Sequence, residues 1–167
     1  NIGVMSFKKI DNFLAKEQFE KLQNLICNPD NNFPWYYKNI SEVDKGFFTH
    51  YFYVDNKIYC NYFNDYVEPI LKQLEVKALI EARVHMFISE FFKNKPSEWH
   101  IHYPFKAKTS ILYLNTCDSG TELKINDEEI FIKQEANTML IFDSDIYHRG
   151  TPSTEDDIRY LINFSYF

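Results

Sequence analysis

Hydrophobic side chains recur at helical spacing in two segments of the N-terminal half of the chain. The apolar face of the first predicted helix consists of Leu14, Phe19, Leu22, Leu25 and Ile26. Asp11 is its expected N-cap, and Asn28-Pro29 is expected to end it. The second stripe consists of Tyr59, Phe63, Tyr66, Val67, Ile70, Leu71 and Leu74. Pro69 lies inside this stripe, so we expect it to kink the helix or open its last turns.

Between these helices the pattern predicts a loop and then a strand. The loop, at 31–45, is rich in Asn and contains the aromatic run Trp35–Tyr37, and the strand is Phe47–Val54. After Leu79 the hydrophobic period changes to two residues, as in a strand. The alternating faces of this strand are Ala82, Val84, Met86 and Ile88 on one side and Glu81, Arg83, His85 and Phe87 on the other.

Short strands separated by polar turns fill the rest of the chain. They are predicted at Glu98–Tyr103, Lys108–Asn115, Thr121–Ile125, Glu129–Lys133, Thr138–Phe142, Ile146–Arg149 and Ile158–Phe167. Helices followed by about eight strands predict an α+β protein. We expect a double-stranded β-helix (jelly-roll) core at 79–167, with the helices of 1–78 packed on one sheet. No linker or repeat divides the sequence, so we expect 1–167 to form a single domain.

Composition and charge remove some classes of partner. The formal charge is −6 and no basic stripe is visible, which argues against nucleic acid as a partner. No apolar run approaches the ~20 residues of a membrane span, and no signal-peptide pattern opens the sequence, so no membrane partner is expected. The cysteines, Cys27, Cys60 and Cys117, are odd in number and form no C-x-x-C pair. They are typical of free thiols in the cytoplasm. The sequence does not determine the oligomeric state.

Histidines and one arginine are the candidates for chemistry. His100 and His102 are two positions apart in a predicted strand, so both imidazoles should leave the same face. His148 follows a buried strand, and each of the three could also be an ordinary core or surface histidine. Arg159 lies on an apolar strand, where a buried guanidinium is costly unless it meets an anion. This pattern indicates a metal beside an anionic co-substrate; the alternative for Arg159 is an ion pair with an acidic residue at 155–157.

Several sequence segments resemble one enzyme superfamily. They are WHIHYP at 99–104, TSILYLN at 109–115, SGTEL at 119–123, ANTMLIFDSDIYHRGTP at 136–152 and RYLINFSYF at 159–167. Together they resemble the 2-oxoglutarate/Fe(II)-dependent oxygenases, and most of all the small prolyl-4-hydroxylase-like proteins of marine phages and bacteria. DNFLAKEQFEKLQNLI at 11–26, NNFPWYY at 31–37 and VEPILKQL at 67–74 resemble the N-terminal half of that group more weakly. If the chain is viral, its expected location is the cytoplasm of the host.

The resemblance implies a site and its cofactors. His100 and His148 match the two histidine ligands of Fe(II), and His102 stands where the family has an aspartate. Arg159 and Tyr113 match the residues that hold the distal carboxylate of the co-substrate 2-oxoglutarate, and Asn163 matches a further polar contact. Dioxygen is the second co-substrate. The implied activity is hydroxylation of a side chain of a small molecule or peptide, such as free or peptidyl proline.

The histidine at position 102 leaves the function open. Three neutral imidazoles remove the negative charge that a carboxylate brings, although imidazole also suits iron, copper, nickel and zinc. One alternative is a three-histidine dioxygenase that uses no keto acid, but the glutamate expected after the second histidine is missing from 103–109. Another is a binding module that kept the fold and lost catalysis. Around the substrate, His50, His85, Arg83 and the 35–37 aromatic run are candidates for the rim of the site.

Overall fold

The computed structural model describes residues 6–40, 46–92, 95–154 and 158–167. Its helices are α1 (Lys16–Cys27), the π-helix η2 (Phe63–Val67), α2 (Glu68–Gln73) and the short 3-10 helices η1 (Pro29–Asn31) and η3 (Ser89–Phe92). The N-terminal strands are β1 (Phe7–Ile10), β2 (Tyr36–Lys38), β3 (Phe47–Val54) and β4 (Lys57–Ile58). The others are β5 (Leu79–Ile88), β6 (Lys108–Tyr113), β7 (Gly120–Ile125), β8 (Glu128–Lys133), β9 (Thr138–Asp143), β10 (His148–Gly150) and β11 (Ile158–Tyr166). No helix within these ranges is both long enough and apolar enough to cross a membrane.

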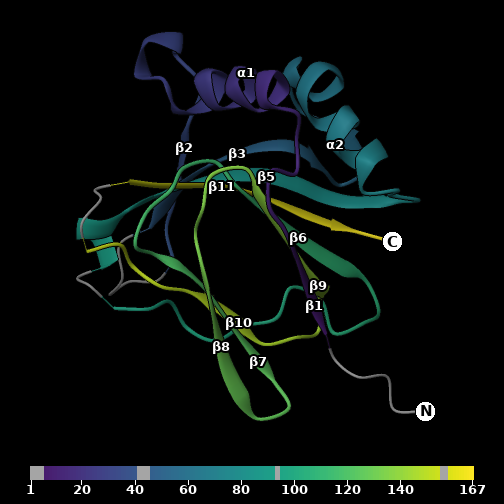
Figure 1. The fold of residues 1–167 in the computed structure, drawn as a ribbon. Helices are drawn as coiled ribbons and strands as arrows, with labels where there is room; N and C mark the ends of the chain where they lie inside the picture. The colour runs from purple at the N-terminus through teal and green to yellow at the C-terminus, as the bar shows by residue number, and fades with distance from the viewer. Residues whose placement is uncertain (1–5, 41–45, 93–94, 155–157) are drawn as a thin grey trace.

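Two antiparallel sheets dominate the structure. The large sheet has the order β1-β9-β6-β11-β5-β3-β2, with β4 paired to β3, and the small sheet has the order β10-β7-β8. Figure 1 shows α1 and α2 on one side of the large sheet and the small sheet on the other side. The structure is therefore rich in antiparallel sheet and has few helices, in keeping with the expected jelly roll.

The large sheet has an apolar core on each face because its strands alternate between them. On β11, Ile162 and Phe164 belong to a core that includes Leu22 of α1 and Ile70 of α2. Leu161, on the opposite face, packs in a second core with side chains from both sheets. That core consists of Ile111, Tyr113, Leu123, Ile125, Ile132, Leu140, Phe142, Ile146 and Leu161. Odd-numbered positions of β11 therefore face the space between the sheets, where a site can form.

Most of the predicted strands are confirmed. Phe47–Val54 has the predicted bounds, and β6, β7, β8, β9 and β11 differ from prediction by two residues at most at either end. The turn between β7 and β8 has Asn126 and Asp127 at φ 51° and 66°. Two successive left-handed residues characterise the type I′ hairpin, and Asn and Asp tolerate this conformation better than most residues.

The N-terminal part is less helical than predicted. Four strands lie among its described residues, and β1 pairs with β9, so the large sheet extends well beyond the predicted boundary at residue 79. The second helical stripe is divided into η2 and α2, and Pro69 lies in the first turn of α2, where a helix needs no N–H donor. Asp11 is not the N-cap, because α1 begins at Lys16 after Ala15. The predicted end of the first helix at Asn28-Pro29 is confirmed.

Candidate metal centre

Three histidines from separate parts of the chain come together at one end of the space between the sheets. One nitrogen from each of His100, His102 and His148 lies within 4.8 Å of the others. The ring centroids of His100 and His148 are 4.4 Å apart, and those of His102 and His148 are 4.8 Å apart. His148 is buried, whereas His100 is exposed. Such a group can hold one metal ion with its open side towards solvent.

The segment that carries His100 and His102 is not the predicted regular strand. It forms an isolated bridge in which the backbone N–H groups of His100 and His148 each donate to the other residue's carbonyl, at 3.0 and 2.9 Å. Further along, the N–H groups of His102 and Tyr103 both donate to the carbonyl of Ser144, so the chain bends at His102. The two imidazoles converge because of these contacts with the loop at 144–148. The strand periodicity invoked for them was wrong, although the convergence was predicted.

Hydrogen bonds orient two of the imidazoles. Nδ1 of His100 lies 2.9 Å from the Glu98 carbonyl, and Nδ1 of His148 lies 3.1 Å from the Ile146 carbonyl. A carbonyl can only accept, so both Nδ1 atoms carry the hydrogen and both Nε2 atoms keep a free lone pair. Among the described residues, the contacts of His102 Nδ1 are longer, at 3.4 Å, with the hydroxyls of Ser165 and Thr109.

Burial keeps the inner imidazoles neutral. Loss of solvation lowers the pKa of His148 to about 3, with the charge of His100 adding to the effect. The pKa of His102 is well below its ordinary value for the same reason, with further lowering by His148, Arg83 and His100. Metals bind the neutral form of imidazole, so these residues are ready donors at neutral pH.

Trp99 braces the segment that leads into the site. Its ring is covered by Lys124 Nζ at 4.5 Å from the centroid and by the Arg149 guanidinium at 4.4 Å. Both cations belong to the small sheet, so the two cation–π contacts attach the 98–103 segment to β7 and β10.

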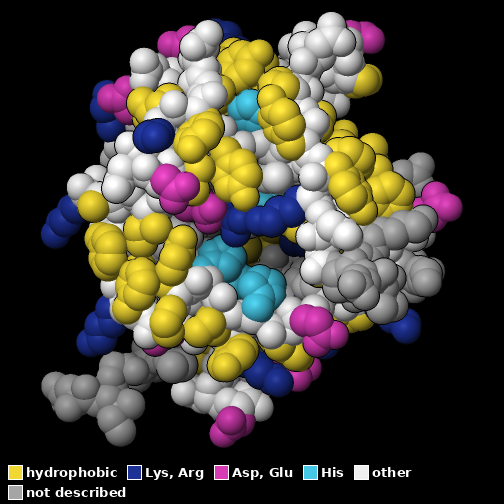
Figure 2. Space-filling view, turned by 180° about the vertical axis from the view of Figure 1, so that it is seen from behind, with side chains coloured by type: hydrophobic (Ala, Val, Ile, Leu, Met, Phe, Trp, Pro, Cys, Tyr) yellow, Lys and Arg dark blue, Asp and Glu magenta, His cyan; other side chains and the backbone are white. Residues whose placement is uncertain are grey.

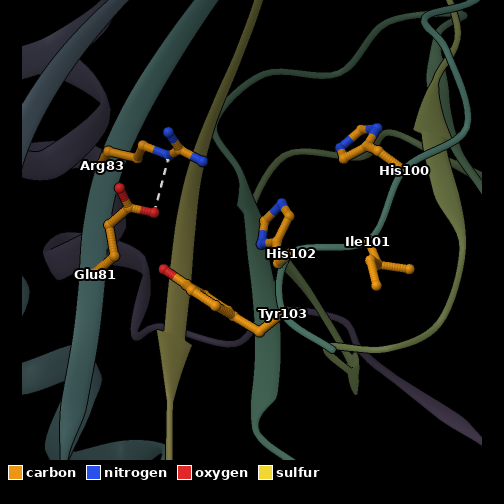
Figure 3. Close-up of a pocket in the computed structure, with 6 residues that line it drawn as sticks. All are labelled: Glu81, Arg83, His100, Ile101, His102 and Tyr103. Carbon is orange, nitrogen blue, oxygen red and sulfur yellow. Dashed lines mark ion pairs between the residues drawn. The ribbon is translucent and has the colours of Figure 1, made fainter. Parts of the chain in front are cut away.

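A small pocket of about 160 Å³ opens next to the histidines. It is lined by Glu81, Arg83, His100, Ile101, His102 and Tyr103. Figure 2 shows histidine side chains at the surface of this hollow, with Lys or Arg side chains along its edge. In Figure 3, Arg83 and Glu81 project from β5 towards His102, and the Tyr103 hydroxyl points towards them. Arg83 was a predicted rim residue, whereas Glu81, on the same strand face, was not singled out.

Arg159 is a buried cation whose hydrogen-bond partners among the described residues are neutral. Its side chain donates from Nε to Gln134 Oε1 at 2.6 Å and from a terminal nitrogen to Thr121 Oγ1 at 3.2 Å. Within the described residues, no Asp or Glu oxygen lies within 4.0 Å of it. The alternative partners Glu155, Asp156 and Asp157 lie outside the described residues. Arg159 is 6% exposed, and burial lowers its pKa, so the charge is held at an energetic cost.

The other predicted co-substrate contacts face the same interior. Tyr113 is fully buried and donates its hydroxyl hydrogen to Thr121 Oγ1 at 2.8 Å, the atom that Arg159 also contacts. Asn163 lies opposite Arg83 in the β5–β11 register, and its buried Oδ1 has no hydrogen-bond partner among the described residues. Arg159 contacts Thr121 of β7, which is opposite Gly150, whereas His148 is opposite Leu123, two residues further along β7. Arg159 therefore lies about two residues, or roughly 7 Å, along the sheet from the histidines.

Two of the expected rim residues lie elsewhere. His50 packs against Phe33 with ring centroids 4.7 Å apart, on the helix-facing core of the large sheet, and its Nδ1 lies 2.9 Å from the Pro34 carbonyl. Trp35 packs against this same core. His85 does face the interior, buried against Phe47 and Phe87. Gln134, which orients Arg159, was not predicted, because a buried glutamine after a strand has no pattern that marks it.

The metal-free protein should lose stability as the pH falls below 6.5. The pKa of His148 is lowered to about 3, and those of His85 and His102 also lie well below 6.5. The unfolded chain therefore binds protons that the folded chain excludes, so unfolding becomes easier as the pH falls from 6.5 towards 3. From His148 alone, the free energy of unfolding should be about 1.4 kcal/mol lower at pH 5.5 than at pH 7.5.

Urea titrations at the two pH values measure this difference. His148→Gln should show a smaller difference than the wild type because it removes one of the excluded protons. Equal stability of the wild-type protein at both pH values would contradict the prediction.

No family model and no curated protein matches the sequence, but solved structures match it in fold. A prolyl-4-hydroxylase from Pseudomonas putida has a TM-score of 0.70 at 12% identity, over 97% of this chain and 92% of its own. A prolyl hydroxylase from Trichoplax adhaerens, solved with a peptide of hypoxia inducible factor, has a TM-score of 0.71 at 17% identity, over 96% of this chain and 83% of its own.

The epimerase SnoN from nogalamycin biosynthesis, solved with Fe3+ and α-ketoglutarate (2-oxoglutarate), has a TM-score of 0.68 at 10% identity, over 98% of this chain and 79% of its own. At identities this low, the similarity shows the fold alone. The chain therefore has the fold of prolyl hydroxylases and other iron- and 2-oxoglutarate-dependent oxygenases.

Proposed function

We propose that this chain is an Fe(II)- and 2-oxoglutarate-dependent dioxygenase that hydroxylates a side chain of a peptide or small molecule, as prolyl hydroxylases do. The observation that carries the proposal is the histidine group next to a buried cation that lacks a carboxylate partner among the described residues. A buried guanidinium is stabilised more by an anion than by neutral hydrogen-bond acceptors. A co-substrate with a distal carboxylate would supply this anion. Residues 1–167 would act as a single domain.

The donor set fits a divalent metal. His100, His102 and His148 would be the ligands, and the hydrogen bonds at Nδ1 of His100 and His148 leave Nε2 free to bind. Imidazole suits iron, and it suits copper, nickel and zinc as well. Among the described residues, no carboxylate belongs to the group, so the ligand set carries no negative charge of its own.

The co-substrate would lie between the histidines and Arg159. Arg159 would pair with its distal carboxylate in a bidentate manner, and Tyr113 would donate a hydrogen bond to the same group. Asn163 would offer a further polar contact from the same face of β11. Leu161 and Phe87 border the region and would exclude water from it. When bound, metal and 2-oxoglutarate supply the oxidising chemistry: with dioxygen they yield succinate, carbon dioxide and a hydroxylated substrate.

Titration with 2-oxoglutarate tests the proposal. Anaerobic calorimetry of the Fe(II)-loaded protein should show binding of one 2-oxoglutarate per chain, and admission of air should then release succinate. Magnesium in place of Fe(II) is the control, because it should not support succinate formation. If 2-oxoglutarate neither binds nor is consumed, the dioxygenase proposal fails.

One observation favours a second candidate, a non-catalytic or metal-altered binding module on the same fold. His102 removes the carboxylate that the resemblance leads us to expect, and three neutral imidazoles can hold zinc as well as iron. A three-histidine dioxygenase that uses no keto acid is weaker, because it gives the buried cation of Arg159 no role. Both rivals predict no turnover of 2-oxoglutarate, so the titration also distinguishes them from the first proposal.

A further inference from the structure

An ion pair of unusual placement lies in the pocket beside the histidines. Glu81 and Arg83 are two residues apart on β5 and project from one face of it, with Arg83 Nε 3.3 Å from Glu81 Oε2. Their side chains are 13% and 19% exposed, so both charges are largely removed from water. Both line the pocket that His100 and His102 also line.

This pair contributes little to holding the fold together. Both residues belong to the same strand, so their attraction links no two elements of the structure. Removing two charges from water is costly, and apolar side chains of similar size often serve equally well at such positions. The bond between them is also imperfect, because Arg83 Nε has no well-aligned hydrogen-bond partner among the described residues. Two opposite charges held at a cost beside a candidate reaction centre favour a role in binding.

The arrangement complements a molecule that carries both charges itself. An α-amino acid has its ammonium and carboxylate groups on the same carbon, about as close together as the charges of Glu81 and Arg83. Arg83 presents a planar fork of donors that matches a carboxylate, and Glu81 presents acceptors for an ammonium. The Tyr103 hydroxyl points towards the pair and adds a donor or acceptor (Figure 3).

The size of the pocket limits the ligand. Its volume of about 160 Å³ is below the roughly 300–1,000 Å³ of pockets that enclose drug-sized ligands. A residue inside a peptide would also leave the ion pair unused, because its amino and carboxyl groups are both tied up in amide bonds. The charges and the volume therefore agree on a small molecule with two free charged ends.

We propose that Glu81 and Arg83 bind the α-ammonium and α-carboxylate groups of a free amino acid and direct its side chain towards the histidines. The inference rests on the proposed function in taking the histidine group as the reaction centre, but binding at the pair requires no metal. Under it the primary substrate is a free amino acid, and Arg83 and Glu81 determine specificity.

Calorimetric titration of the metal-free protein with individual proteinogenic L-amino acids tests the proposal. At least one free amino acid should bind, and its N-acetyl derivative and its amide should each bind at least tenfold more weakly. In Arg83→Gln the free amino acid and its amide should bind with equal affinity. In Glu81→Gln the free amino acid and its N-acetyl derivative should bind with equal affinity. Glu68→Gln is the control: it breaks the ion pair with Lys72 on α2, outside the pocket, and should change no amino-acid affinity.

Three results would overturn the inference. One is that no free amino acid binds; another is that the blocked forms or a peptide bind as well as the free form. The third is that Arg83→Gln weakens the binding of 2-oxoglutarate as much as it weakens the binding of the amino acid, because Arg83 would then belong to the co-substrate site. If 2-oxoglutarate binds but no amino acid does, the proposed function stands and this inference fails. If an amino acid binds selectively but 2-oxoglutarate does not bind, the amino-acid site stands and the proposed function fails.

Discussion

In Arg159→Ala, binding of 2-oxoglutarate is expected to fall below detection while the histidine group still binds metal. Arg159 is buried, and its described partners, Gln134 and Thr121, are both neutral. Removing one partner of a buried charge pair typically costs ~2–5 kcal/mol, which is a loss of at least about thirtyfold in affinity. Calorimetry with 2-oxoglutarate, and with its unreactive analogue N-oxalylglycine, measures the change. Equal binding by wild type and variant would remove Arg159 from the co-substrate site.

The stability of an apolar variant separates a functional arginine from a structural one. Arg159→Met fills the same space without a charge, and replacing a buried charge by an apolar side chain is often neutral or stabilising. The melting temperature of this variant in the absence of 2-oxoglutarate should therefore equal or exceed that of the wild type. A large fall in melting temperature would mean that Arg159 serves the fold, for instance through an ion pair with an acidic residue at 155–157.

Gly150→Ala should weaken the binding of 2-oxoglutarate by displacing the Arg159 side chain without removing it. A Cβ at position 150 would lie 2.5 Å from a terminal nitrogen of Arg159, so the guanidinium must shift. The end of a long side chain can move at small cost, so the fold should tolerate the change. We expect a loss of 2-oxoglutarate affinity of about tenfold, equivalent to 1.4 kcal/mol, which is smaller than in Arg159→Ala.

Alternating patterns predicted the strands well because one physical cause dominates there. The central strands of the large sheet, β6, β9 and β11, contribute one face to each of the two apolar cores. The bounds of the strands are marked where polar turn residues interrupt the apolar pattern, as at Asn126 and Asp127 between β7 and β8 of the small sheet. The short strands β1, β2 and β4 have no such signal: Tyr36, Tyr37 and Lys38 of β2 are all exposed, so only pairing with β3 makes them a strand.

The histidine group shows that a correct prediction can rest on a mistaken local structure. Spacing in the sequence suggested that His100 and His102 share a strand face, yet the chain forms no regular strand there and bends at His102. Their convergence depends on backbone donors that find Ser144 and His148 far along the chain. Such contacts are set by the packing of the whole molecule and leave no periodic trace. For the same reason, no pattern indicated that Gln134 would orient Arg159.

Replacing His102 with aspartate should strengthen the binding of Fe(II). In the wild type, three neutral imidazoles and a 2-oxoglutarate dianion leave Fe(II) with no net charge, whereas H102D brings the total to −1. Imidazole also favours softer or later metals, so a carboxylate should shift preference towards iron. The Arg83 charge is close enough to lower the pKa of His102, so it would also stabilise a carboxylate there. A tenfold gain in anaerobic Fe(II) affinity corresponds to 1.4 kcal/mol.

The outcome of H102D also decides what the histidine is for. If His102 is an impaired substitute, the variant should consume 2-oxoglutarate faster than the wild type even without a substrate, measured as succinate. Ser165 and Thr109 lie near enough to bond the outer oxygen of the shorter side chain and hold it towards the metal. H102A is the control, since it removes the third donor and should bind metal more weakly than either. If H102D instead loses a turnover that the wild type has, the three-histidine centre is itself the working catalyst. If neither protein binds Fe(II) or consumes 2-oxoglutarate, the oxygenase hypothesis fails and the binding-module hypothesis replaces it.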